Sequence, residues 1–252
     1  MNLSDRDRAF YEWQLDVPGF GEEGQAILRQ STALVSRIGG LGGPIALELA
    51  AAGIGRLILI HGGNLEPSDL NRQILMRHED LGKPRVESAR KTLQTFNPHI
   101  EVEIIDSHMT AELAREWVTR ADMVFDAAPR FPERYHMNTE CVRQKKPLID
   151  AAMFNLEGQV IPIVPGVTPC LACLYPEEPP HWRRRFPVIG AVSALIGNIA
   201  VMEGIKLLTG LGTVALNQMI YVNTSDFNIQ KIAIARNPEC RICGKTNDPA
   251  RS

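Results

Sequence analysis

The sequence lacks the features that mark nucleic-acid-binding, membrane or exported proteins. Its 27 Lys and Arg nearly balance 29 Asp and Glu, and the net charge of -2 gives no electrostatic reason to expect nucleic acid or an anionic membrane as partner. The N-terminus, Met1 to Arg8, lacks the apolar stretch of a signal peptide. The longest apolar region, Val188 to Met202, contains Asn198 and runs into Glu203, which predicts a buried helix instead of a membrane span. We therefore expect a reduced, cytoplasmic protein.

Cysteine is also scarce, but four of the five cysteines form two pairs with the same spacing. Cys170 and Cys173 make one Cys-x-x-Cys pair, and Cys240 and Cys243 make the other. Because a two-residue spacer lets both sulfurs reach one tetrahedral ion, the pairs predict a closed, structural zinc site. Such a site would tie the end of the chain to its middle. Disulfides or separate core thiols are the alternatives, and nothing in the sequence suggests export to an oxidising compartment.

The first 150 residues alternate apolar runs of strand length with helical segments. We expect strands at 32–36, 56–60, 102–105, 123–126 and 148–151, and helices at 44–52, 83–96, 111–119 and 132–145. This alternation predicts a Rossmann-like, doubly wound α/β fold with a mainly parallel sheet. Residues 159–164 and 219–234 alternate as antiparallel strands do, with a long apolar helix at 189–208 between them. We expect them to extend the sheet.

A glycine-rich stretch, Gly39 to Gly43, lies between the first expected strand and the first expected helix. Backbone N–H groups and a helix N-terminus favour anions at such a place, and glycine lets a ligand approach the backbone. A tight turn without a ligand is an equally simple alternative. Arg72 and Lys83 each stand shortly before an expected helix, from which they could reach a triphosphate.

Several short motifs follow one another from about Asp16 to Gly244. They are Gly39–Gly42, Ala52–Leu57, Leu70–Gln73, Gly82–Ser88, Asn97–Pro98, Glu157–Gln159, the two cysteine pairs and Met202–Lys206. In this order they resemble the ThiF/MoeB/HesA family of adenylyltransferases, bacterial relatives of the ubiquitin-activating E1 enzymes. Three further segments look most like the HesA branch, which is associated with nitrogenase gene clusters. These segments are His61–Leu65, Pro165–Cys170 and Arg185–Ser193.

The resemblance implies an E1-like adenylation domain with structural zinc at residues 31–244. An N-terminal helical segment at 1–30 would precede it, and a flexible tail at 245–252 would follow. The implied cofactors are ATP, magnesium and zinc. The implied reaction adenylates a carboxylate, such as the Gly-Gly end of a ubiquitin-like or sulfur-carrier protein, and releases pyrophosphate. A homodimer is implied as well, and the HesA-like motifs suggest a metallocofactor-assembly protein as another partner.

Some implied nucleotide-site residues are present in this sequence. Asn71 and Arg72 match, and Gly39, Gly40 and Gly42 form the phosphate turn. Lys83 stands two residues from the place of the family's phosphate-binding lysine, and that place is taken by Arg85.

Other implied site residues are replaced. Arg37 stands where the first glycine of the turn is expected, and His61 stands where an acidic residue would bind ribose. The magnesium-binding aspartate falls on Pro129, for which Asp126 is the nearest substitute, and the arginine supplied by a partner subunit falls on Trp13.

These replacements leave two main hypotheses for function. The chain is either an ATP-dependent adenylyltransferase with a remodelled site, or a weak or inactive relative that binds nucleotide or a partner. An NAD-dependent oxidoreductase is a third reading, against which the cysteine pairs and the Asn71–Gln73 segment argue. A covalent thioester is not expected, because no cysteine lies between Cys173 and Cys240, and Cys141 reads as a small core residue. The basic, aromatic run His181–Phe186 is either a solvated loop or a substrate contact.

Overall fold

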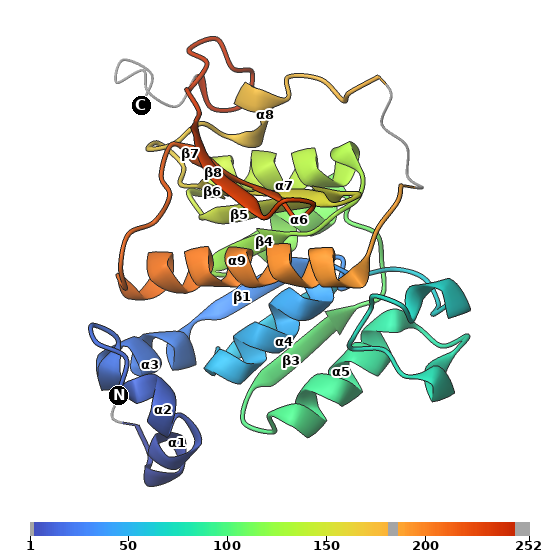
Figure 1. The fold of residues 1–252 in the computed structure, drawn as a ribbon, viewed down its shortest axis with the longest axis vertical. Coiled ribbons are helices and arrows are strands. Elements are labelled where there is room, and N and C mark those ends of the chain that lie inside the picture. Colours follow the sequence, from blue (N-terminus) through green and yellow to red (C-terminus); the bar gives the residue numbers. More distant parts are fainter. Residues whose placement is uncertain (1–2, 181–185, 245–252) are drawn as a thin grey trace.

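The computed structural model describes residues 3–180 and 186–244 and shows an α/β fold built on one mixed sheet (Figure 1). The strands are β1 Thr32–Ser36, β2 Arg56–Ile60, β3 Glu101–Ile105, β4 Met123–Asp126, β5 Leu148–Phe154, β6 Glu157–Ile163, β7 Gln218–Asn223 and β8 Asn228–Ala233. The helices are α1 Asp5–Phe10, α2 Glu12–Leu15, α3 Gly21–Gln30, α4 Gly42–Ala52, α5 Arg85–Phe96, α6 Ala111–Val118, α7 Phe131–Gln144, α8 Leu171–Leu174 and α9 Gly190–Thr209, with short 3-10 turns η1 Pro67–Asp69 and η2 His78–Asp80.

The sheet has eight strands in the order β3-β2-β1-β4-β5-β6-β7-β8. The first five in this order run parallel, and β5 to β8 pair antiparallel with their neighbours. The predicted doubly wound sheet with an antiparallel extension is therefore confirmed. The strand order reverses between β1 and β4, and ligands of open α/β sheets bind at the carboxyl ends of the strands at such a point.

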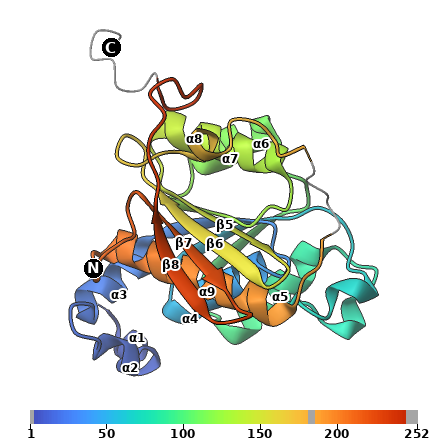
Figure 2. The same cartoon turned by 45° about the horizontal axis from the view of Figure 1, so that its top comes forward.

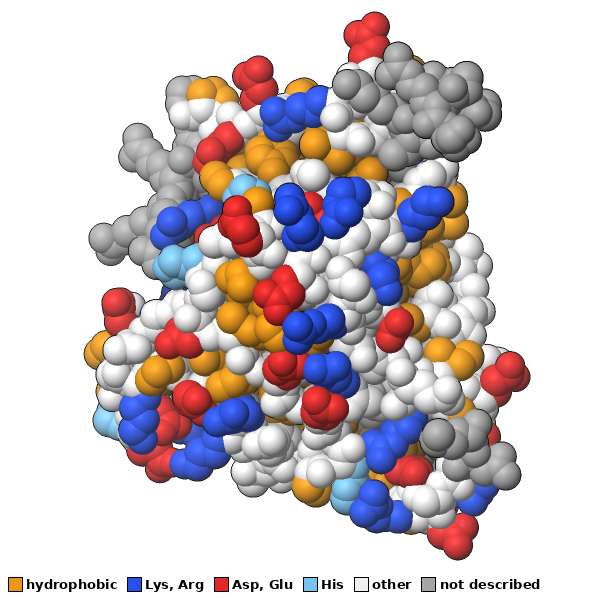
Figure 3. Space-filling view, turned by 180° about the vertical axis from the view of Figure 1, so that it is seen from behind, with side chains coloured by type: hydrophobic (Ala, Val, Ile, Leu, Met, Phe, Trp, Pro, Cys, Tyr) orange, Lys and Arg blue, Asp and Glu red, His pale blue; other side chains and the backbone are white. Residues whose placement is uncertain are grey.

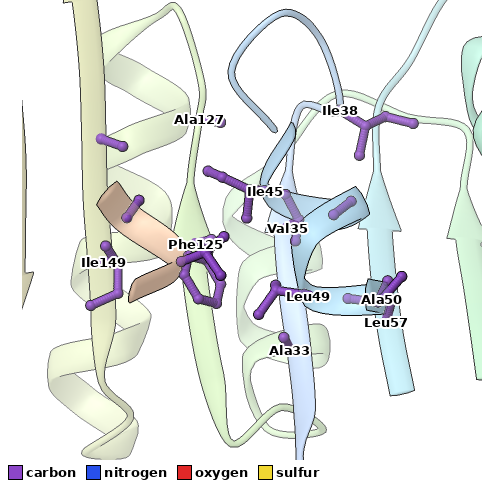
Figure 4. Close-up of a cluster of buried hydrophobic side chains, with 14 of the residues drawn as sticks. Ala33, Val35, Ile38, Ile45, Leu49, Ala50, Leu57, Phe125, Ala127 and Ile149 are labelled. Carbon is purple, nitrogen blue, oxygen red and sulfur yellow. The ribbon is translucent and has the colours of Figure 1, made fainter. Parts of the chain in front are cut away.

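The inner parallel strands β1, β2 and β4 are mainly apolar because helices cover both faces of the sheet, whereas the edge strand β3 carries Glu101 and Glu103. On β1, Val35 belongs to the core formed with α4, α5 and α9, whereas Leu34 belongs to the core formed with α6 and α7. Figure 4 shows the first core, in which Phe125 of β4 lies near Ile45 and Leu49 of α4. Figure 2 shows α6, α7 and α8 on one side of the sheet and α4, α5 and α9 on the other.

Helix α9 is the long apolar helix that the sequence predicts, and it contacts α4, β5 and β6. Two glycines permit the close approach of α9 to strands β4 and β6. A side chain at Gly204 would collide with Phe125, and one at Gly158 would collide with Ile196 of α9. Within the described residues, α9 alone has the length and hydropathy that would let a helix cross a membrane, and 44% of that stretch is buried inside the protein.

The N-terminal helices pack against the C-terminal end of α4. The side chains of Gln14 and Gln25 both donate to the carbonyl oxygen of Ala52, at 2.9 and 3.0 Å. Tyr11 lies against Gly53, whose φ of 85° ends the helix in a left-handed conformation. These contacts place α1 and α2 at the end of α4 that is remote from the glycine turn.

Several element boundaries differ from expectation, among them those of α5 and β5. The helix expected from Lys83 begins at Arg85, because Pro84 takes the N-cap position. Strand β5 continues to Phe154, where it forms a hairpin with β6, and the four-residue α8 was not expected. The proposed tail, 245–252, and most of the basic run His181–Phe186 lie outside the described residues.

The molecule seen from behind carries basic and acidic side chains mixed with apolar ones (Figure 3). Ion pairs follow the same pattern, with Arg120, just after α6, pairing with Glu116 of α6 at 2.9 Å and Arg143 pairing with Glu140 of α7 at 2.6 Å. Because each pair joins opposite charges close in the sequence, these basic residues are locally balanced.

Candidate nucleotide site and metal centre

The glycine turn follows β1 at the point where the strand order reverses. The Gly39 N–H donates to the carbonyl oxygen of Arg37 at 2.8 Å, and the Gly43 N–H donates to that of Gly39 at 2.9 Å. A side chain at Gly42 would collide with the Arg37 carbonyl oxygen, so only glycine fits at the start of α4. No side chain caps α4. Gly43 already donates to Gly39 and Pro44 has no N–H, so an anion at the start of this helix would be bound by the N–H of Gly42.

Residues from three other segments lie against this turn. A Cβ at Gly40 would lie 3.0 Å from the Arg72 side chain, and one at Gly39 would lie 3.9 Å from the His61 ring. Arg72 donates to the Asn71 side chain at 3.0 Å. The fold thus brings Asn71, Arg72 and His61 to the predicted glycines, although their roles toward a nucleotide stay predictions.

Asp69 organises the cations beside the turn. Arg85 donates to its Oδ2 through Nε at 3.0 Å and Nη2 at 2.5 Å, and Gln73 donates to its Oδ1 at 2.6 Å. Arg72 approaches the same carboxylate at 3.5 Å. Arg85 also reaches across to Gly63, where a Cβ would lie 3.0 Å from its Nη1. One buried carboxylate therefore holds the guanidinium of Arg85 and lies beside that of Arg72, whose shorter bond, at 2.6 Å, goes to the Ser68 carbonyl oxygen.

Lys83 is directed elsewhere. Its ammonium group pairs with Asp80 at 2.9 Å, and Asp80 also accepts from the Ser88 hydroxyl at 2.9 Å. Both contacts keep the pKa of Asp80 below its usual value, with the bond from Lys83 as the larger cause. Together with Lys91, these residues line a hollow beside α5. Arg85 thus contacts Asp69 and Gly63 beside the site, whereas Lys83 contacts Asp80.

Arg37 has a partner that the sequence did not reveal. Its guanidinium donates twice to Glu133 on α7, at 2.7 and 2.6 Å, and both side chains are more than nine-tenths buried. Its backbone has φ of 62°, a left-handed conformation that glycine adopts more easily. In this structure Arg37 therefore forms an ion pair that joins the turn to α7, and its role toward a nucleotide stays a prediction.

Asp126 is buried at the end of β4. Its Oδ1 accepts from the Ala128 N–H at 2.8 Å and the Ser36 hydroxyl at 3.3 Å, and its Oδ2 lies 3.5 Å from Arg134. Arg134 is itself bound to Asp150 at 2.7 Å. Burial raises the pKa of Asp126 to about 7, against the attraction of Arg134.

These residues do not fit the magnesium ion that the resemblance implies. Magnesium requires oxygen ligands in an octahedral shell, and the side chain of Pro129 carries no oxygen. Asp126, the expected substitute, is fully buried; its Oδ1 accepts from the Ala128 N–H, and its Oδ2, which accepts no hydrogen bond from the described residues, faces Arg134 at 3.5 Å and is one oxygen where an octahedral shell needs several. We therefore derive no step through a magnesium ion held by this segment.

The four cysteines of the two pairs converge as the sequence predicts. Their sulfur atoms all lie within 4.8 Å of one another, and the Sγ atoms of Cys170 and Cys240 are 3.7 Å apart. Four sulfurs bound to one zinc ion are about 3.8 Å apart in a tetrahedron with Zn–S bonds of about 2.3 Å. Since none of the five cysteines, all of which lie in the described residues, forms a disulfide, this donor set is consistent with a zinc site.

Among the four cysteines of this metal centre, Cys243 lies in surroundings that favour the thiolate form. Burial would raise the pKa of Cys243, but hydrogen bonds from Arg236 and the neighbouring cysteines lower it to about 7. The second pair needs a tight turn, because a side chain at Gly244 would collide with the Pro238 carbonyl oxygen. Cys141, by contrast, is fully buried in the α7 core, where desolvation raises its pKa.

Trp13 lies far from the glycine turn of its own chain. Its side chain is 90% exposed on α2, which packs at the C-terminal end of α4. The turn lies at the N-terminal end of the same helix, about 16 Å away for eleven residues. Any role of Trp13 in a nucleotide site would therefore require another subunit.

Sequence reasoning missed the residues that hold the site residues in place. Asp69 stands three and four residues before Arg72 and Gln73, a spacing that signals side-chain contact on a helical turn. Glu133 gave no local signal, because it lies 96 residues from Arg37 in the sequence.

Comparison with known proteins identifies the family. The profile of the ThiF family matches residues 11–242. Protein HesA, heterocyst, of Trichormus variabilis is 43% identical over 244 residues, which covers 97% of this chain and 91% of the relative. The sulfur carrier protein adenylyltransferase of Thermus thermophilus is 35% identical over 243 residues, covering 93% and 90%. The crystal structure of E. coli MccB with ATP matches with a TM-score of 0.80 at 25% identity, over 96% of this chain and 75% of that chain. The chain belongs to the ThiF family.

Proposed function

We propose that the chain is an ATP-dependent adenylyltransferase that activates the C-terminal carboxylate of a small ubiquitin-like or sulfur-carrier protein. The observation that carries the proposal is the glycine turn at the reversal of the sheet, with Arg72 against Gly40 and Arg85 against Gly63. The name of the Thermus thermophilus relative supports the reaction and the substrate class, and the ATP complex of MccB supports the nucleotide. A metallocofactor-assembly protein is the other partner class that the HesA-like motifs suggest.

In this proposal the phosphates of ATP lie over Gly39, Gly40 and Gly42. The N–H of Gly42 at the start of α4 and the guanidinium of Arg72 then face phosphoryl oxygens. A carboxylate oxygen of the substrate attacks the α-phosphorus, an acyl–phosphate bond forms, and the bond to the β-phosphate breaks with its electrons leaving on pyrophosphate. Fixed positive charge beside this centre stabilises the transition state more than the ground state.

Asp69 is proposed as a positioning residue. It contacts Arg72 and Arg85 through hydrogen bonds and is itself buried. Because its two oxygens are already occupied, it fixes the direction of both guanidinium groups before ATP arrives. Such preorganisation lowers the cost of ordering long side chains at the moment of binding.

We propose a structural role for zinc at the four cysteines and a homodimeric, cytoplasmic protein. The zinc would join the segment after β6 to the segment after β8, because the two pairs come from these two places. A closed four-sulfur shell has no open position for chemistry. Light scattering after gel filtration would test the dimer.

A second candidate function is a nucleotide- or partner-binding subunit without adenylation activity. Pro129 favours it, because its side chain cannot supply the carboxylate that the resemblance implies at this position. The two hypotheses differ in one measurement, since a binding subunit retains ATP affinity but does not make an acyl-adenylate.

Pyrophosphate exchange tests the first hypothesis directly. Purified protein with ATP, labelled pyrophosphate and a sulfur-carrier protein ending in Gly-Gly should incorporate label into ATP slowly, and Pro129→Asp should incorporate it faster. Arg72→Ala is the matched control and should lose exchange. If a set of such carriers gives no exchange with wild type or with Pro129→Asp, while ATP still binds, the second hypothesis is the better account.

A further inference from the structure

Three buried carboxylates border the glycine turn, and each of them lies against an arginine. Asp69 lies with Arg85, Asp126 with Arg134, and Glu133 with Arg37. Their side chains are between 0% and 7% exposed, and the ion-pair distances are 2.5, 3.5 and 2.6 Å. A metal ion brought in by a nucleotide would have to displace an arginine to reach Asp69 or Glu133, and would have to enter the fully buried surroundings of Asp126 beside Arg134.

Asp69 has little capacity left for a metal. Its Oδ2 accepts from Arg85 and from the Glu66 N–H at 3.0 Å, and its Oδ1 accepts from Gln73 at 2.6 Å and from Arg72 at 3.5 Å. Magnesium needs near-ideal octahedral geometry and loses its water shell reluctantly. It would therefore gain little from an oxygen that already accepts short, charge-assisted bonds.

Glu133 is occupied in the same way, whereas Asp126 has one buried oxygen, Oδ2, that accepts no hydrogen bond within the described part of the chain and lies 3.5 Å from Arg134. Both oxygens of Glu133 accept from Arg37 in a bidentate pair. Asp126 accepts from the Ala128 N–H, faces Arg134 and is fully buried, and between it and Glu133 the chain carries Pro129.

Asp106 is an exposed carboxylate at this edge of the sheet. It follows β3 and accepts from the Gly63 N–H at 3.3 Å. Strand β3 is separated from β1 by β2, so it lies about 10 Å from the strand that leads into the turn. Asp106 is therefore on the side of His61 and Gly63, away from the first N–H groups of α4.

We propose that this site binds a nucleoside triphosphate through arginines and backbone N–H groups, without a protein carboxylate as a ligand to magnesium. The proposal rests on the proposed function for the place of the nucleotide. Asp69 contributes one negative charge, and Arg72 and Arg85 contribute two positive charges, so the cluster keeps a net charge of +1 (2 − 1). Free ATP carries more negative charge than its magnesium complex. This surplus of positive charge therefore attracts free ATP at least as strongly.

Calorimetric titration of the full-length, zinc-loaded protein with ATP tests the proposal. One titration contains excess magnesium chloride, and the other uses buffer freed of divalent ions by a chelating resin. Zinc content is measured before and after each titration, so that loss of structural metal is not mistaken for loss of a magnesium effect. We expect the two dissociation constants to agree within about threefold, or about 0.7 kcal/mol.

The outcomes separate this proposal from the proposed function. Binding at least about tenfold weaker without magnesium, or about 1.4 kcal/mol, would overturn the inference and leave the nucleotide site in place. Absence of binding in both buffers would overturn the nucleotide site and the inference together.

Two variants test which residues make ATP affinity depend on magnesium. Pro129→Asp, checked for folding by circular dichroism, should gain magnesium dependence of ATP affinity, because a carboxylate then stands in the segment after β4. Asp106→Asn is the matched control and should leave both dissociation constants unchanged. If Asp106→Asn alters the affinity only in the presence of magnesium, Asp106 binds the metal and the proposal is wrong.

Discussion

Replacing Glu133 by glutamine should destabilise the protein strongly, although the change removes no atom of the carbon skeleton. Glu133 accepts two bonds from Arg37, at 2.6 and 2.7 Å, and the two side chains are 7% and 8% exposed. Glutamine leaves one acceptor oxygen but removes the charge, so the guanidinium of Arg37 stays buried without a counter-ion. Breaking a buried pair in this way costs about 3–5 kcal/mol, and the retained oxygen places our expectation at about 3 kcal/mol. Because the pair is shielded from solvent, added salt should change the loss little.

A double-mutant cycle measures the pair itself. Arg37→Gly alone should cost a similar amount, because Glu133 then stays buried and charged. Arg37→Gly combined with Glu133→Gln should return to within about 1 kcal/mol of wild type, since both charges are gone and glycine accepts the φ of 62°. Unfolding in urea is followed by circular dichroism and by tryptophan fluorescence. Coincident curves justify two-state free energies.

An exposed pair supplies the control for this cycle. Glu87→Gln breaks the contact between Glu87 and Arg90, whose side chains are 49% and 40% exposed. This substitution should lower the free energy of unfolding by less than about 0.5 kcal/mol. A loss below about 1 kcal/mol for Glu133→Gln would refute the buried-pair argument. A double variant as unstable as the single variants would refute it as well.

Three further predictions concern the metal centre, the buried carboxylate and the nucleotide. Cys240→Ser should lose most of the bound zinc, because one of four sulfurs is gone; plasma mass spectrometry measures this, and unchanged zinc content would contradict the site. Burial raises the pKa of Asp126 from its ordinary value of 3.8 to about 7, so its contribution to stability falls as pH rises between these values. Asp126→Asn should therefore gain on the order of 1–2 kcal/mol relative to wild type between about pH 5 and about pH 8 in urea unfolding, and parallel pH profiles would count against it. Arg72→Ala should weaken ATP binding by about 1.5–3 kcal/mol in calorimetry, and an unchanged affinity would place the nucleotide elsewhere.

The fold was predictable because its signals are local in the sequence. The inner strands of the parallel sheet are buried on both faces, so they appear as short apolar runs, as in Leu57–Ile60. The glycines of the turn were equally visible, because a position such as Gly42 has no room for a side chain. The cysteine pairs were visible because a two-residue spacer already lets two sulfurs reach one ion.

The boundaries and additions that sequence reasoning missed depend on neighbours. Helix α5 begins at Arg85 because Pro84 occupies the cap, and the side chain of Arg85 is then held by Asp69. Strand β5 extends to Phe154 because β6 supplies a full antiparallel ladder of hydrogen bonds. The sequence around Arg85 does not show that Asp69 will bind it, and the sequence of β5 does not show that β6 will pair with its last residues.

The sequence by itself determined the α/β architecture, the glycine turn and the cysteine donor set. The periodicity of apolar residues decides the first, the lack of room for a side chain decides the second, and the two-residue spacing within each cysteine pair decides the third. Only the tertiary structure decided what the charged residues do. The sequence alone allows Arg37 to bind phosphate, but in the fold it is paired with Glu133 of α7. The sequence likewise allows Asp126 to bind a metal, but in the fold it is buried beside Arg134. The role of a charge depends on which opposite charge lies within about 3 Å and on how much water remains, and in this fold both come from residues distant in the chain.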